Sequence, residues 1–334
     1  MTITEFRPSE TEYTGSPREW FFGEDWLQRD IETIFEPRWL VAGHVDQLAL
    51  PGASVSIALG DRVCEVHRGP SGEFVATETR SGRRLHTDEW VGFIFVAFSD
   101  ARPAPLFEEL DRTGLDGYDT RRLKLASFKS HEVKANWKVV FENNNECYHC
   151  ELNHPELVTQ IDWKVTEAAD FDQYMADRAN GREVETSNKV GSYSTLNNKR
   201  VSQQLLHRHP EASPAVGSWT VFWEPGSGLA FAPDHAWLQA PRPTGAGTTQ
   251  VDQYWLVADD AVEGVDYEID DLRFFWDATL MQDKDLCENV QRGMSIPVYQ
   301  PGPLNRRFQG GNAGFYSWYE AEMHKRHPEI FSGA

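Results

Sequence analysis

The segment from Asn136 to Leu157, NWKVVFENNNECYHCELNHPEL, constrains the fold more than any other part of the chain. It is dense in acids, histidines and cysteines, so it is a metal site, a redox pair or a polar helix that is rich in these residue types. A helix would place residues separated by steps of three and four on one face. The residues that such a helix aligns are Val139, Glu142, Glu146 and His149.

Pro155 should end this helix. The residue before a proline is pushed out of the α region, so we expect the helix to end near Leu152 or Asn153. His154 can then turn back toward His149, and two imidazoles at a helix end can ligate one ion. Without further support, two histidines this close in sequence are more often exposed or hydrogen-bonded than metal ligands.

A third ligand is predicted on a long helix from about Ile269 to Arg292. Steps of four, three and four residues place Asp283 on an apolar face with Trp276, Leu280 and Cys287. A carboxylate on the buried side of a helix is costly unless it is paired or bound to metal. Asp285 shares a face with Gln282 and Glu288 and is predicted to be solvated.

The ligand types indicate the metal. Two imidazoles and one carboxylate form the facial triad of non-heme Fe(II) oxygenases, which leaves coordination positions open for O2. Zinc with the same three ligands is the chemical alternative, but the H-E-x-x-H pattern of zinc proteases is absent from the sequence.

Cys147 and Cys150 form a C-x2-C motif around His149. A redox or zinc function for such a pair needs a thioredoxin-like βαβ context or a second cysteine pair, and the sequence offers neither. We therefore expect both cysteines to be structural thiols. The H-x-H motif at His207 and His209 lies on a polar segment and is predicted to be exposed.

Composition excludes several classes of function. The formal net charge of −20 argues against nucleic acid as a partner. The longest apolar runs, such as residues 92–98, are too short to cross a membrane. The first residues, MTITEFRPSETEY, lack a basic region followed by an apolar one. We expect a cytoplasmic, reduced protein, because four cysteines in a chain of this length do not form a disulfide framework.

Apolar spacing predicts a helix from about Trp26 to Trp39, followed by a β-rich region. Strand-like runs are LVAGHV, SVSIAL, RVCEVH, EFVATE and GFIFVAF, and later SWTVFWEP, HAWLQAPRP and TTQVDQYWLVAD. A segment rich in Pro, Gly and charge, Arg102 to Asp119, separates the two sets. This pattern predicts two domains, residues 1–122 and 123–334, and in the second an α+β arrangement of long helices on an antiparallel sheet.

The motif N-W-K-x-V-x-E-N-x-x-E-C-Y-H-C-x-x-x-H-P-E-L resembles the catalytic domain of Rieske-type non-heme iron oxygenases, and it is most similar to the glycine betaine and choline monooxygenase branch. The segments IFEPRWLVAGHVDQL, DDAVEGVDYEIDDLRFFWDAT, QDKDLCENVQRG and GFYSWYEAEM extend the likeness over most of the chain. The resemblance implies a helix-grip (START-like) catalytic domain that holds one mononuclear Fe(II) through His149, His154 and Asp283. It also implies that Glu146 bridges this iron to the electron-donating cluster of a neighbouring subunit in a trimer.

The sequence departs from this family at the cluster. A Rieske 2Fe–2S cluster needs two cysteines and two histidines, usually as C-x-H and a later C-x2-H. Cys64, in C-E-V-H, is the only cysteine before residue 140. The family inserts its cluster-binding subdomain where this chain passes through Glu78 to Arg84. We therefore predict a β-rich remnant of a Rieske domain without a 2Fe–2S cluster.

An oxygenase of this type consumes two electrons per turnover, which a chain without a cluster cannot store. The favoured hypothesis is an active subunit that receives electrons from a homologous cluster-bearing partner, with a reductase or ferredoxin upstream, in a trimer-based hetero-oligomer. The alternatives are a non-catalytic structural or regulatory subunit of such a complex and a stand-alone helix-grip ligand-binding protein. The retained ligands and Glu146 argue against both alternatives.

The resembled branch oxidises N-methyl groups of small quaternary ammonium compounds, and a hydroxylated methyl group leaves as formaldehyde. A pocket for such cations needs aromatic faces. The candidates on predicted strands are Trp219, Trp223, Trp237 and Tyr254, which could equally be core residues. The segment LNRRFQGGNAG is atypical of the branch, so another N-methyl compound or a different small amphiphile remains open.

Overall fold

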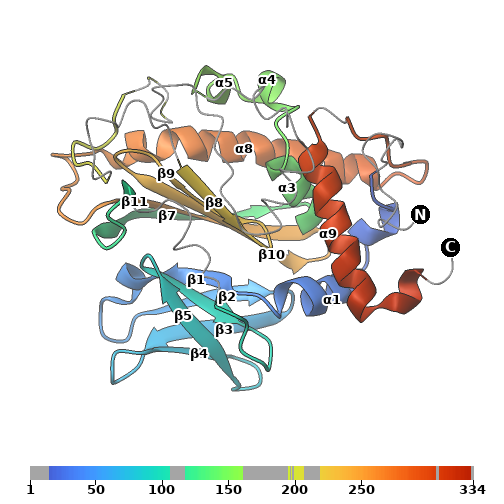
Figure 1. Ribbon diagram of the computed structural model, residues 1–334, viewed down its shortest axis with the longest axis horizontal. Coiled ribbons are helices and arrows are strands. Elements are labelled where there is room, and N and C mark those ends of the chain that lie inside the picture. The colour runs from blue at the N-terminus through green and yellow to red at the C-terminus, as the bar shows by residue number, and fades with distance from the viewer. Residues whose placement is uncertain are drawn as a thin grey trace.

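The computed structural model describes residues 15–105, 117–160, 195, 197, 199–206, 219–305 and 308–331. Two antiparallel sheets lie one above the other, with helices over the outer face and at one end of the upper sheet (Figure 1). The strand order is β1-β6-β5-β4-β3-β2 in the first sheet and β7-β11-β10-β9-β8 in the second.

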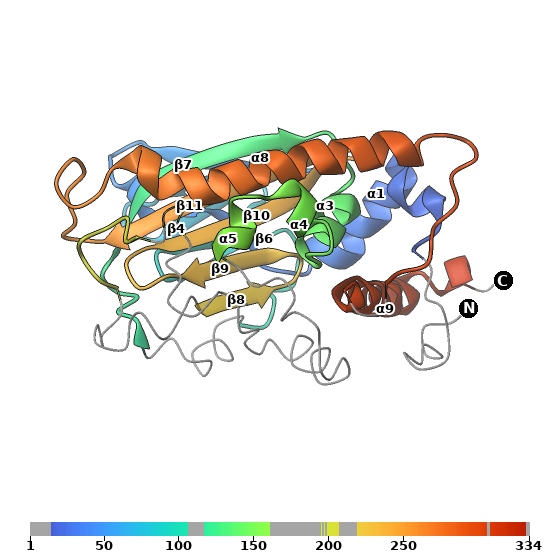
Figure 2. The same cartoon turned by 90° about the horizontal axis from the view of Figure 1, so that it is seen from above.

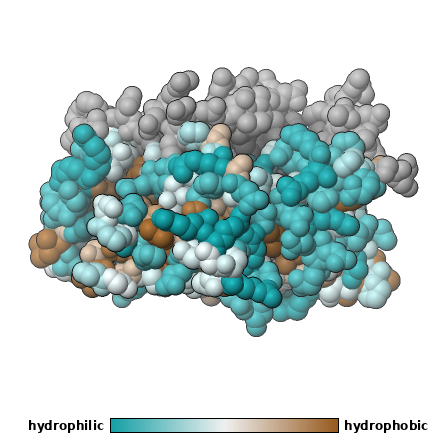
Figure 3. Space-filling view, turned by 90° about the horizontal axis from the view of Figure 1, so that it is seen from below, coloured by the Kyte–Doolittle hydropathy of each residue, from teal (hydrophilic) through white to brown (hydrophobic). Residues whose placement is uncertain are grey.

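The first sheet follows a short helical lead-in. This consists of η2 (Arg18–Phe21), α1 (Glu24–Asp30) and a π-helical turn, η3 (Ile31–Phe35). The strands are β1 (Leu40–His44), β2 (Ser54–Leu59), β3 (Arg62–Arg68), β4 (Phe74–Glu78), β5 (Arg84–Trp90) and β6 (Phe93–Ala97), with η4 (Val45–Leu48) between β1 and β2. The face of the molecule seen from below is mostly hydrophilic, with apolar residues only scattered over it (Figure 3).

The second sheet consists of β7 (Leu123–Val133), β8 (Trp219–Trp223), β9 (Ser227–Phe231), β10 (Ala236–Gly245) and β11 (Thr248–Ala258). The long helix α8 (Ile269–Met294) runs along its outer face, and α3 (Trp137–Asn144), α4 (Cys150–Asn153) and α5 (Leu157–Gln160) lie on the same side (Figure 2). The chain then forms α9 (Gly310–Arg326) and η6 (Pro328–Phe331). The site described below lies between α8 and the α3–α4 segment.

Aromatic residues fill the interface between the two sheets. Trp223 packs edge-on against Trp90, with ring centroids 6.4 Å apart, and Tyr254 packs edge-on against Phe93 at 5.3 Å. Because side chains alternate along a strand, Val221 of β8 belongs to this same apolar cluster as Trp223. The inner face of the second sheet is therefore filled by side chains that pack against the first sheet. A binding site can form only on its outer face.

A buried ion pair anchors α3, which leads into the candidate ligand segment. Lys138 and Asp30 are both fully buried and form a salt bridge. Asp30 also accepts hydrogen bonds from Tyr319 of α9 and from Trp137 Nε1, the latter at 2.8 Å. Burial lowers the pKa of Lys138, and the adjacent carboxylate opposes that effect. Since breaking a buried pair typically costs about 3–5 kcal/mol, this network fixes α3 against α1 and α9.

Most elements expected from the sequence are present, but three strands were not predicted. β5 carries one arginine and two adjacent acids, β7 combines lysines with serines, and β9 reads SGLAF, so none has the strand signal of its neighbours. The helix predicted from about Trp26 instead begins at Glu24 as α1 and changes to π geometry at Ile31. No helix among the described residues is long and apolar enough to cross a membrane.

Candidate metal centre

The ligand segment folds as two short helices. The prediction of one helix continuing through His149 is wrong, because α3 ends at Asn144 and α4 begins only at Cys150. Residues 143–145 are consecutive asparagines, whose side chains compete with helical hydrogen bonding. The break also accommodates α9, since even a methyl group at Gly311 would lie 2.3 Å from the carbonyl oxygen of Asn145.

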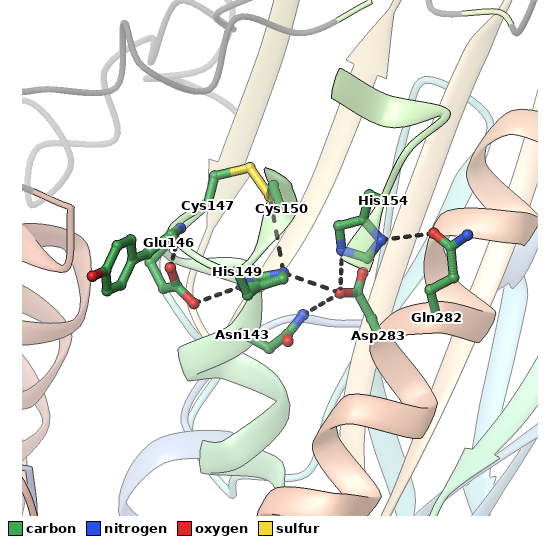
Figure 4. The surroundings of a disulfide bond; sticks show 9 residues. Asn143, Glu146, Cys147, His149, Cys150, His154, Gln282 and Asp283 are labelled. Atoms are coloured by element: carbon green, nitrogen blue, oxygen red, sulfur yellow. Dashed lines mark hydrogen bonds and ion pairs between the residues drawn. A yellow bond between two sulfur atoms is a disulfide. The ribbon is translucent and has the colours of Figure 1, made fainter. Parts of the chain in front are cut away.

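The end of α4 is where the sequence predicts it. α4 ends at Asn153, and His154, which precedes Pro155, leaves the helical conformation with φ −124° and ψ 69°. The turn brings the two imidazole rings together, with centroids 5.1 Å apart. Asp283, on the inward side of α8, completes the group (Figure 4).

Both imidazoles present Nε2 to the same carboxylate oxygen. Asp283 Oδ1 lies 3.3 Å from His149 Nε2 and 2.9 Å from His154 Nε2. The side chain of Asp283 is 15% exposed, that of His149 is 13% exposed and that of His154 is 1% exposed. Two ring nitrogens from the ends of α4 and one carboxylate from α8 therefore converge at a position that is largely shielded from water.

Each imidazole is oriented from behind. His149 Nδ1 lies 2.6 Å from Glu146 Oε1, and His154 Nδ1 lies 2.7 Å from Gln282 Oε1. Both partners are acceptors, so each ring keeps a proton on Nδ1 and presents Nε2, the nitrogen that would bind a metal, toward Asp283. Metal-binding histidines are usually held in this way by outer hydrogen-bond acceptors.

Two residues of this arrangement were not anticipated from the sequence. Asn143 donates from Nδ2 to Asp283 Oδ1 at 2.7 Å, and Gln282 Nε2 donates to Glu156 at 3.0 Å while its oxygen holds His154. Gln282 adjoins Asp283 on the helix, and helical phase alone assigned it to the solvated face with Asp285. Asp285 itself is exposed, as predicted.

The electrostatics of the group favour a cation. Burial by itself lowers the pKa of His149, but hydrogen bonds to Asp283 and Glu146 outweigh it and raise that pKa to about 9. Burial raises the pKa of Asp283, and the two histidines outweigh that effect and lower it. His154 Nε2 is buried and has no aligned hydrogen-bond partner. A divalent ion fits this donor set, because it would satisfy both Nε2 atoms and the carboxylate together.

A cavity of about 190 Å³ opens beside the three side chains. Trp237 lines it and stacks on Trp276 with ring centroids 4.4 Å apart, and Phe222 is also part of the wall. The structure does not bring Trp223 or Tyr254 to this cavity, since both pack between the sheets. Trp219 lies in β8, but its side chain is outside the described part of the structure.

A larger cavity, of about 680 Å³, is more open and is bordered by residues 200–203 and 265–268. It contains none of the converging ligands. We therefore assign the chemistry to the smaller cavity, where the donor atoms lie.

The cysteines differ from the expectation. Cys147 and Cys150 are joined in a disulfide, so the prediction that they are separate structural thiols is wrong. A C-x2-C pair on the turn into a short helix has its side chains close enough to bond without any thioredoxin-like context. His207 and His209 lie outside the described residues.

The sequence matches one family model and several known proteins. The family model described as ring hydroxylating alpha subunit (catalytic domain) matches residues 120–325. The glycine betaine monooxygenase oxygenase subunit of Chromohalobacter salexigens is 30% identical, over 89% of this chain and 83% of its own length.

Solved structures agree on the fold. A quaternary ammonium Rieske monooxygenase in complex with L-carnitine superimposes with a TM-score of 0.65 at 16% identity, over 97% of this chain and 98% of its own. Naphthalene 1,2-dioxygenase from Rhodococcus, bound to indole, gives a TM-score of 0.61 at 13% identity, over 92% of this chain and 94% of its own. The predicted α+β class, with a Rieske-like β region before the catalytic sheet, is confirmed.

Proposed function

The chain belongs to the ring-hydroxylating alpha-subunit family of Rieske-type non-heme iron oxygenases, and on this premise we propose which residues hold its iron, what it oxidises and where its electrons come from. It is an oxidoreductase of the monooxygenase type. The proposed reaction is hydroxylation or N-demethylation of a small quaternary ammonium or N-methyl compound at one mononuclear Fe(II), with electrons from the Rieske cluster of a partner subunit.

The proposed iron ligands are His149, His154 and Asp283. The observation that carries this assignment is the convergence of both Nε2 atoms on Asp283 Oδ1 while both Nδ1 atoms are held from behind. When bound, Fe(II) in such a facial triad supplies O2 activation. The histidines bind as neutral imidazoles, so the proton that His149 carries in the metal-free chain must leave when the ion enters.

Neighbouring side chains have positioning roles. Glu146 and Gln282 keep each ring in the tautomer that presents Nε2. Asn143 occupies one lone pair of Asp283 Oδ1, which restricts rotation of the carboxylate. The site is thus organised before any metal arrives.

The proposed substrate is a small organic cation. The cavity is smaller than the range of about 300–1,000 Å³ that is typical of sites for drug-sized ligands. The stacked rings of Trp237 and Trp276 offer an aromatic wall, and aromatic faces attract quaternary ammonium groups. Similar proteins are named glycine betaine and carnitine monooxygenase oxygenase subunits, which makes N-methyl groups of betaines the first compounds to test.

The proposed electron source is another subunit. Cys64 is buried in β3 with its pKa raised to about 12 by burial, which disfavours the thiolate that a cluster requires. Near the expected insertion point, β4 and β5 are joined by residues 79–83 alone, and the Glu78 amide bonds to the Arg83 carbonyl at 2.9 Å. A similar monooxygenase is described in terms of inter-subunit electron transfer. Glu146, which holds His149, is the proposed link to the partner's cluster.

Formaldehyde release tests the proposed reaction. The iron-loaded chain, mixed with a cluster-bearing partner and reductase isolated from the same host, should release formaldehyde from at least one of glycine betaine, carnitine or choline. Trp237→Ala should raise the KM for that compound by about tenfold, which corresponds to roughly 1.4 kcal/mol of cation–aromatic attraction. Phe128→Ala, on β7 and outside the lining of the cavity, is the aromatic control and should leave the KM unchanged. Oxidation of none of these compounds, with iron bound and the partner active, would refute the proposed substrate class.

A further inference from the structure

The Cys147–Cys150 disulfide lies directly beside the proposed iron ligands (Figure 4). Cys150 is buried, and its Sγ lies 3.9 Å from His149 Nε2. Cys150, His149 and His154 each offer one ligand atom, and these three atoms lie within 4.8 Å of one another. The function proposed above gives neither cysteine a role.

The position of the Cys150 sulfur is suitable for a metal ligand. Metal–nitrogen and metal–thiolate bonds of about 2.1 and 2.3 Å place two donors on one tetrahedral ion roughly 3.6 Å apart. The observed 3.9 Å is close to this separation, so a small side-chain rotation would suffice. In the disulfide, however, this sulfur is bonded to Cys147 and is not the thiolate that binds metals.

We propose that the Cys147–Cys150 pair is a redox switch on the metal centre, in which the disulfide withholds the Cys150 sulfur and reduction releases it as an additional metal ligand. This inference rests on the metal site proposed above. In the reduced state the donor set becomes two imidazoles, one carboxylate and one thiolate, which suits Zn²⁺ and other thiophilic ions. The added sulfur would occupy a coordination position that an oxygenase must leave open.

The chemistry of the switch is thiol–disulfide exchange. A dithiol reductant attacks one sulfur, the Sγ–Sγ bond breaks, and two electrons pass to the protein as the reductant becomes a disulfide. Cys147 and Cys150 each gain one proton and become thiols. When Cys150 binds the metal, its proton passes to solvent.

A purely structural disulfide is the competing explanation. Loop-closure entropy grows with loop length, and this disulfide spans a sequence separation of 3, so its contribution to stability is small. A structural bond would also leave the metal's ligands the same in the oxidised and reduced protein. The ligand set is therefore the property to measure.

Cobalt(II) reports this ligand set directly, because a bound thiolate adds a near-ultraviolet charge-transfer band to its visible spectrum. Four metal-loaded samples are compared: oxidised wild type, wild type reduced with dithiothreitol that is then removed under nitrogen, Cys147→Ser and Cys150→Ser. The band should be present in reduced wild type and in Cys147→Ser, and absent from the other two. Zn²⁺ should bind Cys147→Ser more tightly than Cys150→Ser, by on the order of tenfold. Cys64→Ser, remote in β3, is the matched cysteine control and should behave as wild type.

The outcomes separate the switch from the proposed function. Cobalt bound in every sample, with the charge-transfer band missing from both reduced wild type and Cys147→Ser, would overturn the switch and leave the metal site intact. A band that persists in Cys150→Ser would overturn the choice of sulfur. Absence of cobalt from every sample, wild type included, would overturn the metal site itself. Should Cys147→Ser fail to fold, reduced wild type still gives the decisive spectrum.

Discussion

The two sheets carry similar ligand-type residues, yet only the region over the second brings them together. On β3, Cys64 is buried and His67 is exposed, because residues three apart on a strand point to opposite faces. Over the second sheet, the break before α4 and the turn at Pro155 direct His149 and His154 toward one point. Among the described residues, no histidine, cysteine or acid group outside this region forms a cluster of three that could hold a metal.

The charges of the two regions differ in the same way. In the region of the first sheet, Arg62 of β3 pairs with both Glu36 and Glu78, so these two acids are compensated by a fixed cation. Around His149 and His154, the partners of the acids are imidazoles, which can exchange a proton for a metal ion. A metal site therefore requires convergence and exchangeable charge, and residue types alone do not provide them.

Removal of a ligand should have the largest effect. His149→Ala, His154→Ala or Asp283→Ala should reduce bound iron to roughly a tenth of wild type or less and abolish turnover, because each removes a third of the protein ligands. Iron per chain is measured by plasma mass spectrometry. Asp285→Ala and Cys64→Ala should retain full iron, one because its side chain is exposed on α8 and the other because it lies in the first sheet. Iron loss in Asp285→Ala with retention in Asp283→Ala would reverse the assignment.

Glu146→Gln should separate iron binding from electron supply. Glutamine keeps one acceptor beside His149 Nδ1 and removes the charge, so iron should stay bound while partner-driven turnover falls by about tenfold or more. A peroxide-driven single turnover, which needs no cluster, should lose much less. Full partner-driven activity in an assembled complex would show that electrons reach this iron by another route.

Gln282→Ala tests the side chain behind the second imidazole. Loss of the acceptor that holds His154 Nδ1 should weaken Fe(II) binding by roughly tenfold without preventing saturation. Titration with Fe(II) under nitrogen gives the affinity. An affinity equal to that of Asp285→Ala would mean that Gln282 has no positioning role.

A separate contrast concerns two histidines whose pKa values move in opposite directions. In the first sheet, burial lowers the pKa of His44 to about 4, so its contribution to stability is lost as pH falls from 6.5 toward 4. In the metal-free site, the pKa of His149 is raised to about 9, so its contribution is lost as pH rises from 6.5 toward 9. Each contribution is on the order of 3 kcal/mol.

Urea unfolding of metal-free wild type, His44→Gln and His149→Gln across this pH range measures both contributions. His44→Gln should flatten the acid side of the stability profile, and His149→Gln should flatten the alkaline side. The same side flattened by both variants would contradict the contrast between the two regions.

Much of the site was predictable because it depends on local rules. Pro155 fixed the end of α4, and the 3.6-residue period placed Asp283 inward and Asp285 outward. The break after Asn144 was not predictable, because the close approach of Gly311 on α9 is a tertiary contact.

Contacts between distant segments account for the other differences. In the sequence, Trp223, Tyr254 and Trp237 all lie in similar strand-like runs. Only the packing of the second sheet on the first shows that Trp223 and Tyr254 are core residues and that Trp237 lines the cavity. β7 was missed because its pairing with β11 compensates for a weak strand pattern. The roles of Gln282 and Asn143 depend on how α8 packs against α3, and the periodicity of the sequence does not predict that packing.

The most direct test of the account is the metal and cluster content of the chain purified alone under nitrogen. We expect about one Fe(II) per chain, and, after dithionite reduction, neither the absorption nor the electron paramagnetic resonance signal of a Rieske 2Fe–2S cluster. A Rieske signal from this polypeptide, or a chain that binds no iron while correctly folded, would contradict the proposed division between an iron site here and an electron-donating cluster on a partner.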